Sequence, residues 1–250
     1  DTGIDDVVRH VLLPIWNAYS FFTLYANVDG YRAEFRTESE HLLDRYLLAK
    51  TRQLVESVDS KMESYDLPGA TESIQGFIDA LNNWYIRRSR DRFWEKSTKE
   101  NENQKKDAYD TLYTVLKIFS QVSAPFLPMI MEEVHTGLTG EPSVHLTDWP
   151  DAEMLPEDKT LVANMDRIRD AASTALRLRE DEGIRVRLPL SSMVIAGPGS
   201  SSLSNFLELL TDEVNVKKIE LTEDLDKYAT YSLQPNGSLL GPRLGKEVQS

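Results

Sequence analysis

The sequence contains no cysteine, which excludes disulfide bonds and zinc sites with cysteine ligands. It also lacks a long uninterrupted apolar run. The most apolar stretch, residues 7–26, contains charged and polar side chains, whereas a bilayer span needs about 20 predominantly apolar residues. No basic segment precedes this stretch, as one would in a signal peptide. We therefore expect a cytoplasmic protein without a membrane partner.

Positive charge is scarce as well. The chain has 28 Lys and Arg against 41 Asp and Glu, a net charge of −13. This balance excludes a protein that coats nucleic acid through overall basicity. Any binding of RNA must come from a local basic surface. Forty per cent hydrophobic residues in 250 suffice for the core of one large domain or two modest ones.

Apolar residues recur at helical spacing through the first part of the chain. The predicted helices span residues 5–26, 39–65, 71–96, 108–122 and about 124–137. Pro14 should kink the first of them, because it removes a backbone donor. An extended segment, residues 143–150, follows the fifth helix. Five helices joined by short connections predict a helical bundle.

The pattern changes after Pro156. A sixth helix is expected first, and a βαβ-like alternation follows it. These elements are predicted at residues 158–182 (helix), 193–196 (strand), 203–210 (helix) and 216–221 (strand). The predicted fold is therefore mainly α. A helical bundle at residues 1–155 is followed at residues 156–250 by the sixth helix and a small α/β subdomain.

The third predicted helix changes its apolar face halfway along. Its stripe consists of Ile74, Phe77, Ile78, Leu81 and Tyr85. Arg88 and Arg92 continue this stripe, whereas Arg90 lies among Ile86, Phe93 and Trp94. Between residues 84 and 106 there are eight Lys and Arg but only four Asp and Glu. Arginines thus stand where core residues would continue.

Two interpretations of these arginines remain open. They could be paired with carboxylates on neighbouring helices, since a buried arginine is costly without a partner. They could instead bind RNA phosphates, with nearby aromatic rings stacking on bases. We expect Arg88 and Arg90 to be paired internally and Arg87 to lie nearer to water, with Arg92 undecided. The candidate RNA-binding residues are Arg87, Arg88, Arg90, Arg92, Trp94 and Lys96.

Several segments in one order resemble the anticodon-binding domain of isoleucyl-tRNA synthetases. They are residues 11–22, 84–94, 107–112, 124–128, 132–133 and 143–150. Segments 185–190, 213–218 and 240–246 resemble the region that follows this domain in the family. The family usually has Gln at the position of Leu188 and Leu at that of Val214, which weakens any side-chain role at these two positions.

The resemblance implies a class I synthetase, a type of enzyme that binds ATP through His-x-Gly-His and Lys-Met-Ser-Lys-Ser motifs. None of the four histidines forms the first motif. Residues 61–64 only faintly match the second, and Met62 belongs to the apolar stripe of its helix. We therefore expect no catalytic, cofactor or metal site in this chain. The resemblance places ATP and Mg²⁺ chemistry in the rest of the enzyme.

The expected partners are tRNA(Ile) and the remainder of a synthetase chain, with the protein a monomer. The chain begins within a helical pattern and ends without a capping element, so we expect a piece of a longer protein. The alternative is a non-catalytic helical scaffold that binds proteins and is related to synthetases. The full open reading frame, searched upstream for the two ATP motifs, would discriminate between these hypotheses.

Overall fold

The computed structural model describes residues 2–96, 98 and 101–228. It divides the chain into two compact units, one ending at Asp166 and the other beginning at Arg167. The first unit is helical, and the second contains two short parallel strands. The predicted fold class, mainly α with a small α/β part, is thus confirmed. The domain boundary expected after residue 155 stays a prediction, because compactness does not test which part folds independently.

The first predicted helix is a continuous rod with one wide turn. It consists of α1 (Thr2–Val7), the π-helical η1 (Val8–Leu12) and α2 (Leu13–Asp29). Pro14 has no N–H to donate to the carbonyl four residues earlier. Beside it, the Leu13 N–H donates to the carbonyl of Val8, five residues back. A π-helical turn therefore lies directly before the proline that we expected to kink the helix.

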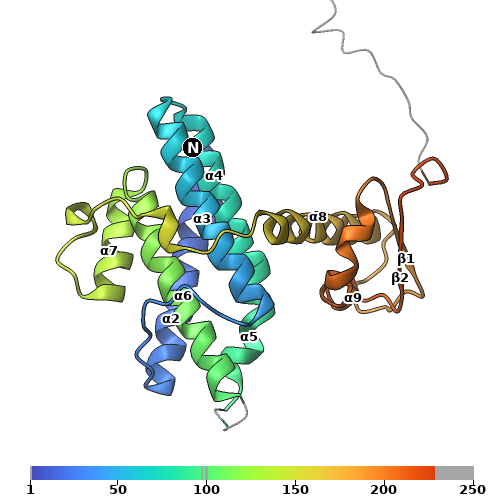
Figure 1. The fold of residues 1–250 in the computed structure, drawn as a ribbon, viewed down its shortest axis with the longest axis horizontal. Coiled ribbons are helices and arrows are strands. Elements are labelled where there is room, and N and C mark those ends of the chain that lie inside the picture. The colour runs from blue at the N-terminus through green and yellow to red at the C-terminus, as the bar shows by residue number, and fades with distance from the viewer. Residues whose placement is uncertain (1, 97, 99–100, 229–250) are drawn as a thin grey trace, which may run out of the picture. The chain divides into compact units, whose positions relative to one another are not determined.

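The next two helices lie side by side (Figure 1). They are α3 (Leu42–Glu63) and α4 (Leu67–Asp79), and α4 continues through the π-helical η2 (Ala80–Ile86) into α5 (Arg87–Trp94). Between α3 and α4 the chain reverses at Tyr65, whose φ is +58°. The Asp66 carboxylate then accepts a hydrogen bond from the Gly69 N–H and caps α4.

Two further helices, α6 (Glu102–Ser123) and α7 (Pro128–Thr139), complete the predicted bundle. Helix α6 packs against both α3 and α7. The core holds large aromatic side chains, with Phe77 stacked on Phe119 and Phe93 edge-on to Tyr109. The segment predicted as extended instead contains a short 3₁₀ turn, η3 (Val144–Leu146), followed by η4 (Ala152–Met154).

The predicted sixth helix is α8 (Lys159–Asp181). The second unit then contains β1 (Met193–Ala196), the 3₁₀ helix η5 (Ser200–Phe206), α9 (Leu207–Val214) and β2 (Ile219–Thr222). The strands pair in parallel, with Met193 opposite Ile219. The predicted βαβ order is therefore confirmed. Segment 240–246 lies outside the described residues.

Two glycines in helices should respond differently to alanine. Gly76 is exposed in α4 with open space around it, so Gly76→Ala should stabilise the first unit by about 0.5–1 kcal/mol. A methyl group at Gly137 would meet the hydroxyl end of the Tyr19 side chain, which must move, so Gly137→Ala should be less stable than Gly76→Ala by about 1 kcal/mol. Urea unfolding followed by tryptophan fluorescence measures both variants, because all four tryptophans precede Asp166. Equal free energies of unfolding for the two variants would contradict this explanation.

Candidate nucleic-acid interface

The π-helical turn η2 determines which side chains of α5 face outward. A wide turn holds an extra residue, and each residue rotates a helix by about 100°. Beyond η2 the buried positions are therefore Ser89 and Phe93 rather than Arg88. The Asn82 side-chain amide donates to the carbonyl of Ile78 and so satisfies an acceptor near this turn. The change of face seen in the sequence thus has a backbone cause.

Arg92 points into the bundle. Its guanidinium donates to both carboxylate oxygens of Asp44 on α3, at 2.6 and 2.8 Å, and to the carbonyl of Gln104 at 2.8 Å. The side chain of Asp44 is 0% exposed and that of Arg92 is 12% exposed. Paired, fork-like hydrogen bonds of this kind are among the strongest that a carboxylate accepts. The structural interpretation is therefore confirmed for Arg92.

Three further side chains surround this ion pair. The hydroxyls of Tyr85 and Ser39 donate to Asp44 at 2.8 and 2.9 Å. Burial raises the pKa of Tyr85, and the negative charge of Asp44 adds to this effect. Burial lowers the pKa of His41, as does the nearby Arg92 charge, so His41 is neutral near pH 7. Its Nδ1 lies 3.2 Å from the Arg92 guanidinium and can accept a hydrogen bond from it.

The opposite face of α5 is exposed and carries Arg87, Arg90 and Trp94, which we call the α5 strip. Trp94 is 53% exposed, and the Arg90 guanidinium carbon lies 5.9 Å from the centroid of its ring. The expected exposure of Arg87 is confirmed, and its Nε donates to the carbonyl of Asn83. The expected burial of Arg90 is wrong: Arg90 is exposed and lies on the same side of α5 as the exposed Trp94, whereas Phe93 is buried.

The two remaining candidates differ from each other. Arg88 is half-buried, with its guanidinium carbon 5.2 Å from the centroid of the buried Trp84 ring. It thus packs against an aromatic ring, and the internal pairing with a carboxylate that we expected stays a prediction. Lys96 follows α5 and is exposed. The structure therefore brings Arg87, Arg90 and Trp94 together on one surface and directs Arg92 away from it.

Lys105 is a buried cation that the sequence analysis did not single out. Its Nζ lies 2.7 Å from the Asp29 carboxylate and 2.7 Å from the carbonyl of Glu95. The Tyr109 hydroxyl donates to the same carboxylate at 2.6 Å. Part of the local positive excess between residues 84 and 106 is thus neutralised inside the bundle. The side chains of the α5 strip remain on the outside.

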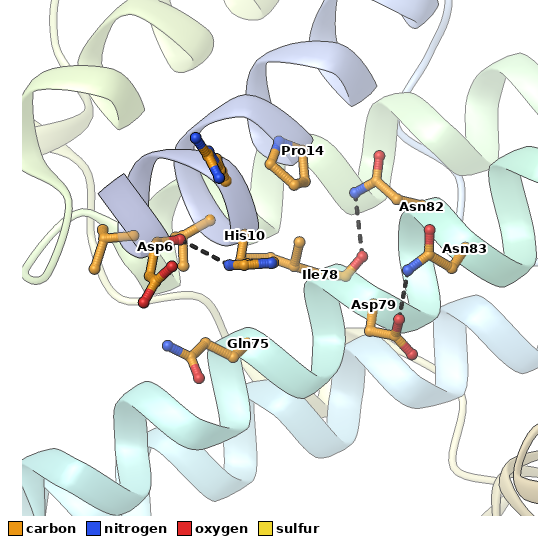
Figure 2. A pocket seen from close by; sticks show the side chains of 11 residues that line it. Asp6, His10, Pro14, Gln75, Ile78, Asp79, Asn82 and Asn83 are labelled. Atoms are coloured by element: carbon orange, nitrogen blue, oxygen red, sulfur yellow. Dashed lines mark hydrogen bonds between the residues drawn. The ribbon is translucent and has the colours of Figure 1, made fainter. Parts of the chain in front are cut away.

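A cavity of about 640 Å³ lies between η1 and the α4–η2 segment (Figure 2). Its lining is rich in amides and includes residues from both π-helical turns. The lining residues are Asp6, Val7, Arg9, His10, Val11, Pro14, Gln75, Ile78, Asp79, Asn82 and Asn83. His10 Nδ1 contacts the carbonyl of Asp6, and Asn83 donates to Asp79. The lining includes no serine, threonine or cysteine nucleophile and no excess of basic residues for a phosphate.

Comparison with known proteins adds independent information. A family model described as the anticodon-binding domain of tRNA ligase matches residues 44–194. The chain is 48% identical over 250 residues to the isoleucine–tRNA ligase of Mycobacterium tuberculosis and 49% identical over 249 residues to that of Leifsonia xyli. The ligase of Tropheryma whipplei is 41% identical over 250 residues.

These alignments cover 99–100% of the chain but only 22–23% of each relative. The chain thus spans less than a quarter of the length of the curated relatives that it matches. In the described part of the chain, no helix is both long and apolar enough to cross a membrane.

Proposed function

The chain belongs to the family of anticodon-binding domains of tRNA ligases, and we propose that it is the tRNA-binding module of an isoleucine–tRNA ligase. Its match to the family model and its identity to isoleucine–tRNA ligases support this proposal. The module binds the anticodon stem-loop of tRNA(Ile) and so orients the tRNA for a distant active site. Its location is the cytoplasm, and it acts as part of a monomeric ligase.

The observation that carries the proposal is the α5 strip. Arg87 and Arg90 supply exposed phosphate-binding groups on a protein whose net charge is negative. Trp94 offers an exposed ring on which an unpaired base can stack. The buried side of the same helix is fixed to α3 through Arg92 and Asp44. The strip is therefore held in place before RNA arrives, which reduces the entropic cost of binding.

The aminoacylation chemistry belongs to the rest of the ligase in this proposal. The sequence contains neither ATP motif of the class I synthetases. Residues outside these 250 therefore bind ATP and Mg²⁺ in this proposal, and this chain binds no cofactor. Exposed apolar side chains on α2 provide a surface for the remainder of the ligase chain. They are Leu13, Trp16, Leu24 and Val28.

The test is the salt dependence of tRNA binding. Replacing Arg87 or Arg90 with alanine should flatten the slope of log K against log salt concentration by about one unit, since each lost phosphate contact removes about one released counterion. Filter binding of the 250-residue chain to a tRNA(Ile) transcript measures this slope. Trp94→Ala should weaken binding about tenfold without changing the slope, through lost stacking.

Arg45→Ala is the matched control for this test. Arg45 is exposed on α3, outside the α5 strip, and its guanidinium pairs with Asp158 at 3.3 Å. Its removal should leave the slope unchanged, and none of the four variants should shift the melting temperature appreciably. The proposed role of the α5 strip would be contradicted if Arg87→Ala and Arg90→Ala kept the slope of the unmodified chain.

A further inference from the structure

Arg179 near the end of α8 is a buried cation bound to backbone carbonyls. The residue is 4% exposed. Its guanidinium donates to the carbonyls of Arg185 and Leu188 at 3.3 and 3.0 Å, and to those of Val214 and Asn215 at 2.9 and 3.0 Å. The last two carbonyls belong to the end of α9, where the helix dipole favours a positive charge. Arg179 therefore holds two backbone segments together.

One of these segments is a tight turn at residues 185–188, which we call the Arg turn. The Leu188 N–H donates to the carbonyl of Arg185 at 2.9 Å and closes the turn. The Asn215 side chain donates to the carbonyl of Val186 at 2.9 Å. Despite these backbone contacts, all four side chains of the turn are exposed. The turn is anchored from within and presents its side chains outward.

The stretch of chain that contains the Arg turn carries positive but no negative side chains, although acidic residues lie just outside it at 180–182 and 212–213. No Asp or Glu occurs from residue 183 to residue 207, although the chain has 41 of them. The Lys217 N–H donates to the carbonyl of Leu190, which places a third exposed cation beside the turn. Within the described ranges, the side chains of Arg185, Arg187 and Lys217 make no hydrogen bond or ion pair.

We propose that the Arg turn is a second RNA-binding site, at which Arg185 and Arg187 bind phosphates of the tRNA backbone. Unpaired guanidinium groups on a fixed turn suit phosphate oxygens, because their forked donors match that geometry. A contact of this kind positions the RNA without reading its sequence. This inference rests on the proposed function and extends tRNA binding from the first unit to the second.

The experiment compares two variants of the 250-residue chain. The variant R185A/R187A lacks both arginines of the turn. For the tRNA(Ile) transcript, the slope of the logarithm of the binding constant against the logarithm of salt concentration should be flatter than in the unmodified chain by about 1.5–2 units. The control is Arg177→Ala. Arg177 is 81% exposed on the same unit but lies 4.0 Å from the Asp181 carboxylate. Its loss should leave the slope unchanged, and thermal melting should be the same in both variants.

A slope in R185A/R187A equal to that of Arg177→Ala would overturn the inference. Parallel titrations of Arg87→Ala and Arg90→Ala separate the two proposals. If these variants flatten the slope while R185A/R187A does not, the second site is refuted and the proposed function stands. If the chain does not bind the transcript even at low salt, both proposals fail. If both sets flatten the slope, both are supported.

Discussion

Replacing Arg92 with alanine should lower the free energy of unfolding of the first unit by about 3–5 kcal/mol, because the substitution leaves Asp44 buried without its counter-charge. Tyr85 and Ser39 still donate hydrogen bonds to the carboxylate, but they do not neutralise it. Such a loss corresponds to a melting temperature lower by roughly 10 °C for a unit of this size. Urea unfolding followed by tryptophan fluorescence gives the measurement.

Arg90→Ala is the control for this prediction, since it removes an exposed arginine two residues away on the same helix. It should change stability by less than about 0.5 kcal/mol. The double variant R92M/D44L replaces the buried pair with apolar side chains and should be more stable than Arg92→Ala alone. Equal stabilities for Arg92→Ala and Arg90→Ala would show that the buried ion pair does not hold α5 against α3.

The second large effect is expected at Arg179. In Arg179→Met the apolar stem remains, but four carbonyls lose a charged donor, and each buried acceptor without a partner costs about 1–3 kcal/mol. Because three of the four hydrogen bonds are only partly buried, we expect local stability to fall by about 3 kcal/mol. The amides of Leu188, Leu190 and Lys217 should then exchange about a hundredfold faster with solvent deuterium.

Hydrogen exchange suits this prediction because the second unit contains no tryptophan. Arg177→Met provides the control on the same helix, since its side chain is mostly exposed. It should leave the exchange rates of those three amides unchanged. Unchanged rates in Arg179→Met as well would mean that the Arg turn is held by other contacts, such as the one from Asn215.

The spacing of apolar residues along the sequence was sufficient to locate most helices and strands. The strand predicted at residues 193–196 matches β1, and the helix predicted at 158–182 matches α8 within one residue at each end. These segments are long or strongly patterned, and nothing distorts their backbone. The 3₁₀ helix η5 was missed in part, since its residues include four serines and a glycine precedes it, a composition typical of a turn.

The candidate site was harder to predict because its geometry depends on distant residues. Asp44 and Arg92 are 48 positions apart, and periodicity does not reveal which helices touch. One signal was present: Asp44 interrupts the apolar residues at the start of α3. The burial expected for Arg90 rested on its place among Ile86, Phe93 and Trp94, and Trp94 is itself exposed. The acceptors that Arg179 contacts are backbone carbonyls. Every residue has one, so the side-chain pattern does not reveal which carbonyls bind Arg179.

The number of residues in the wide turn η2, as well as the type of residues in α5, determines which side chains form the binding surface. If one residue were deleted within Ala80–Ile86, the segment beyond it would rotate by about 100° about its axis relative to α4. Arg87, Arg90 and Trp94 would then leave the outer surface although none of them had changed. In an evolving chain, a single-codon insertion or deletion at this turn can therefore switch the face of α5 that is offered to a ligand. Substitutions within α5 itself would reach the same result only by replacing several side chains at once.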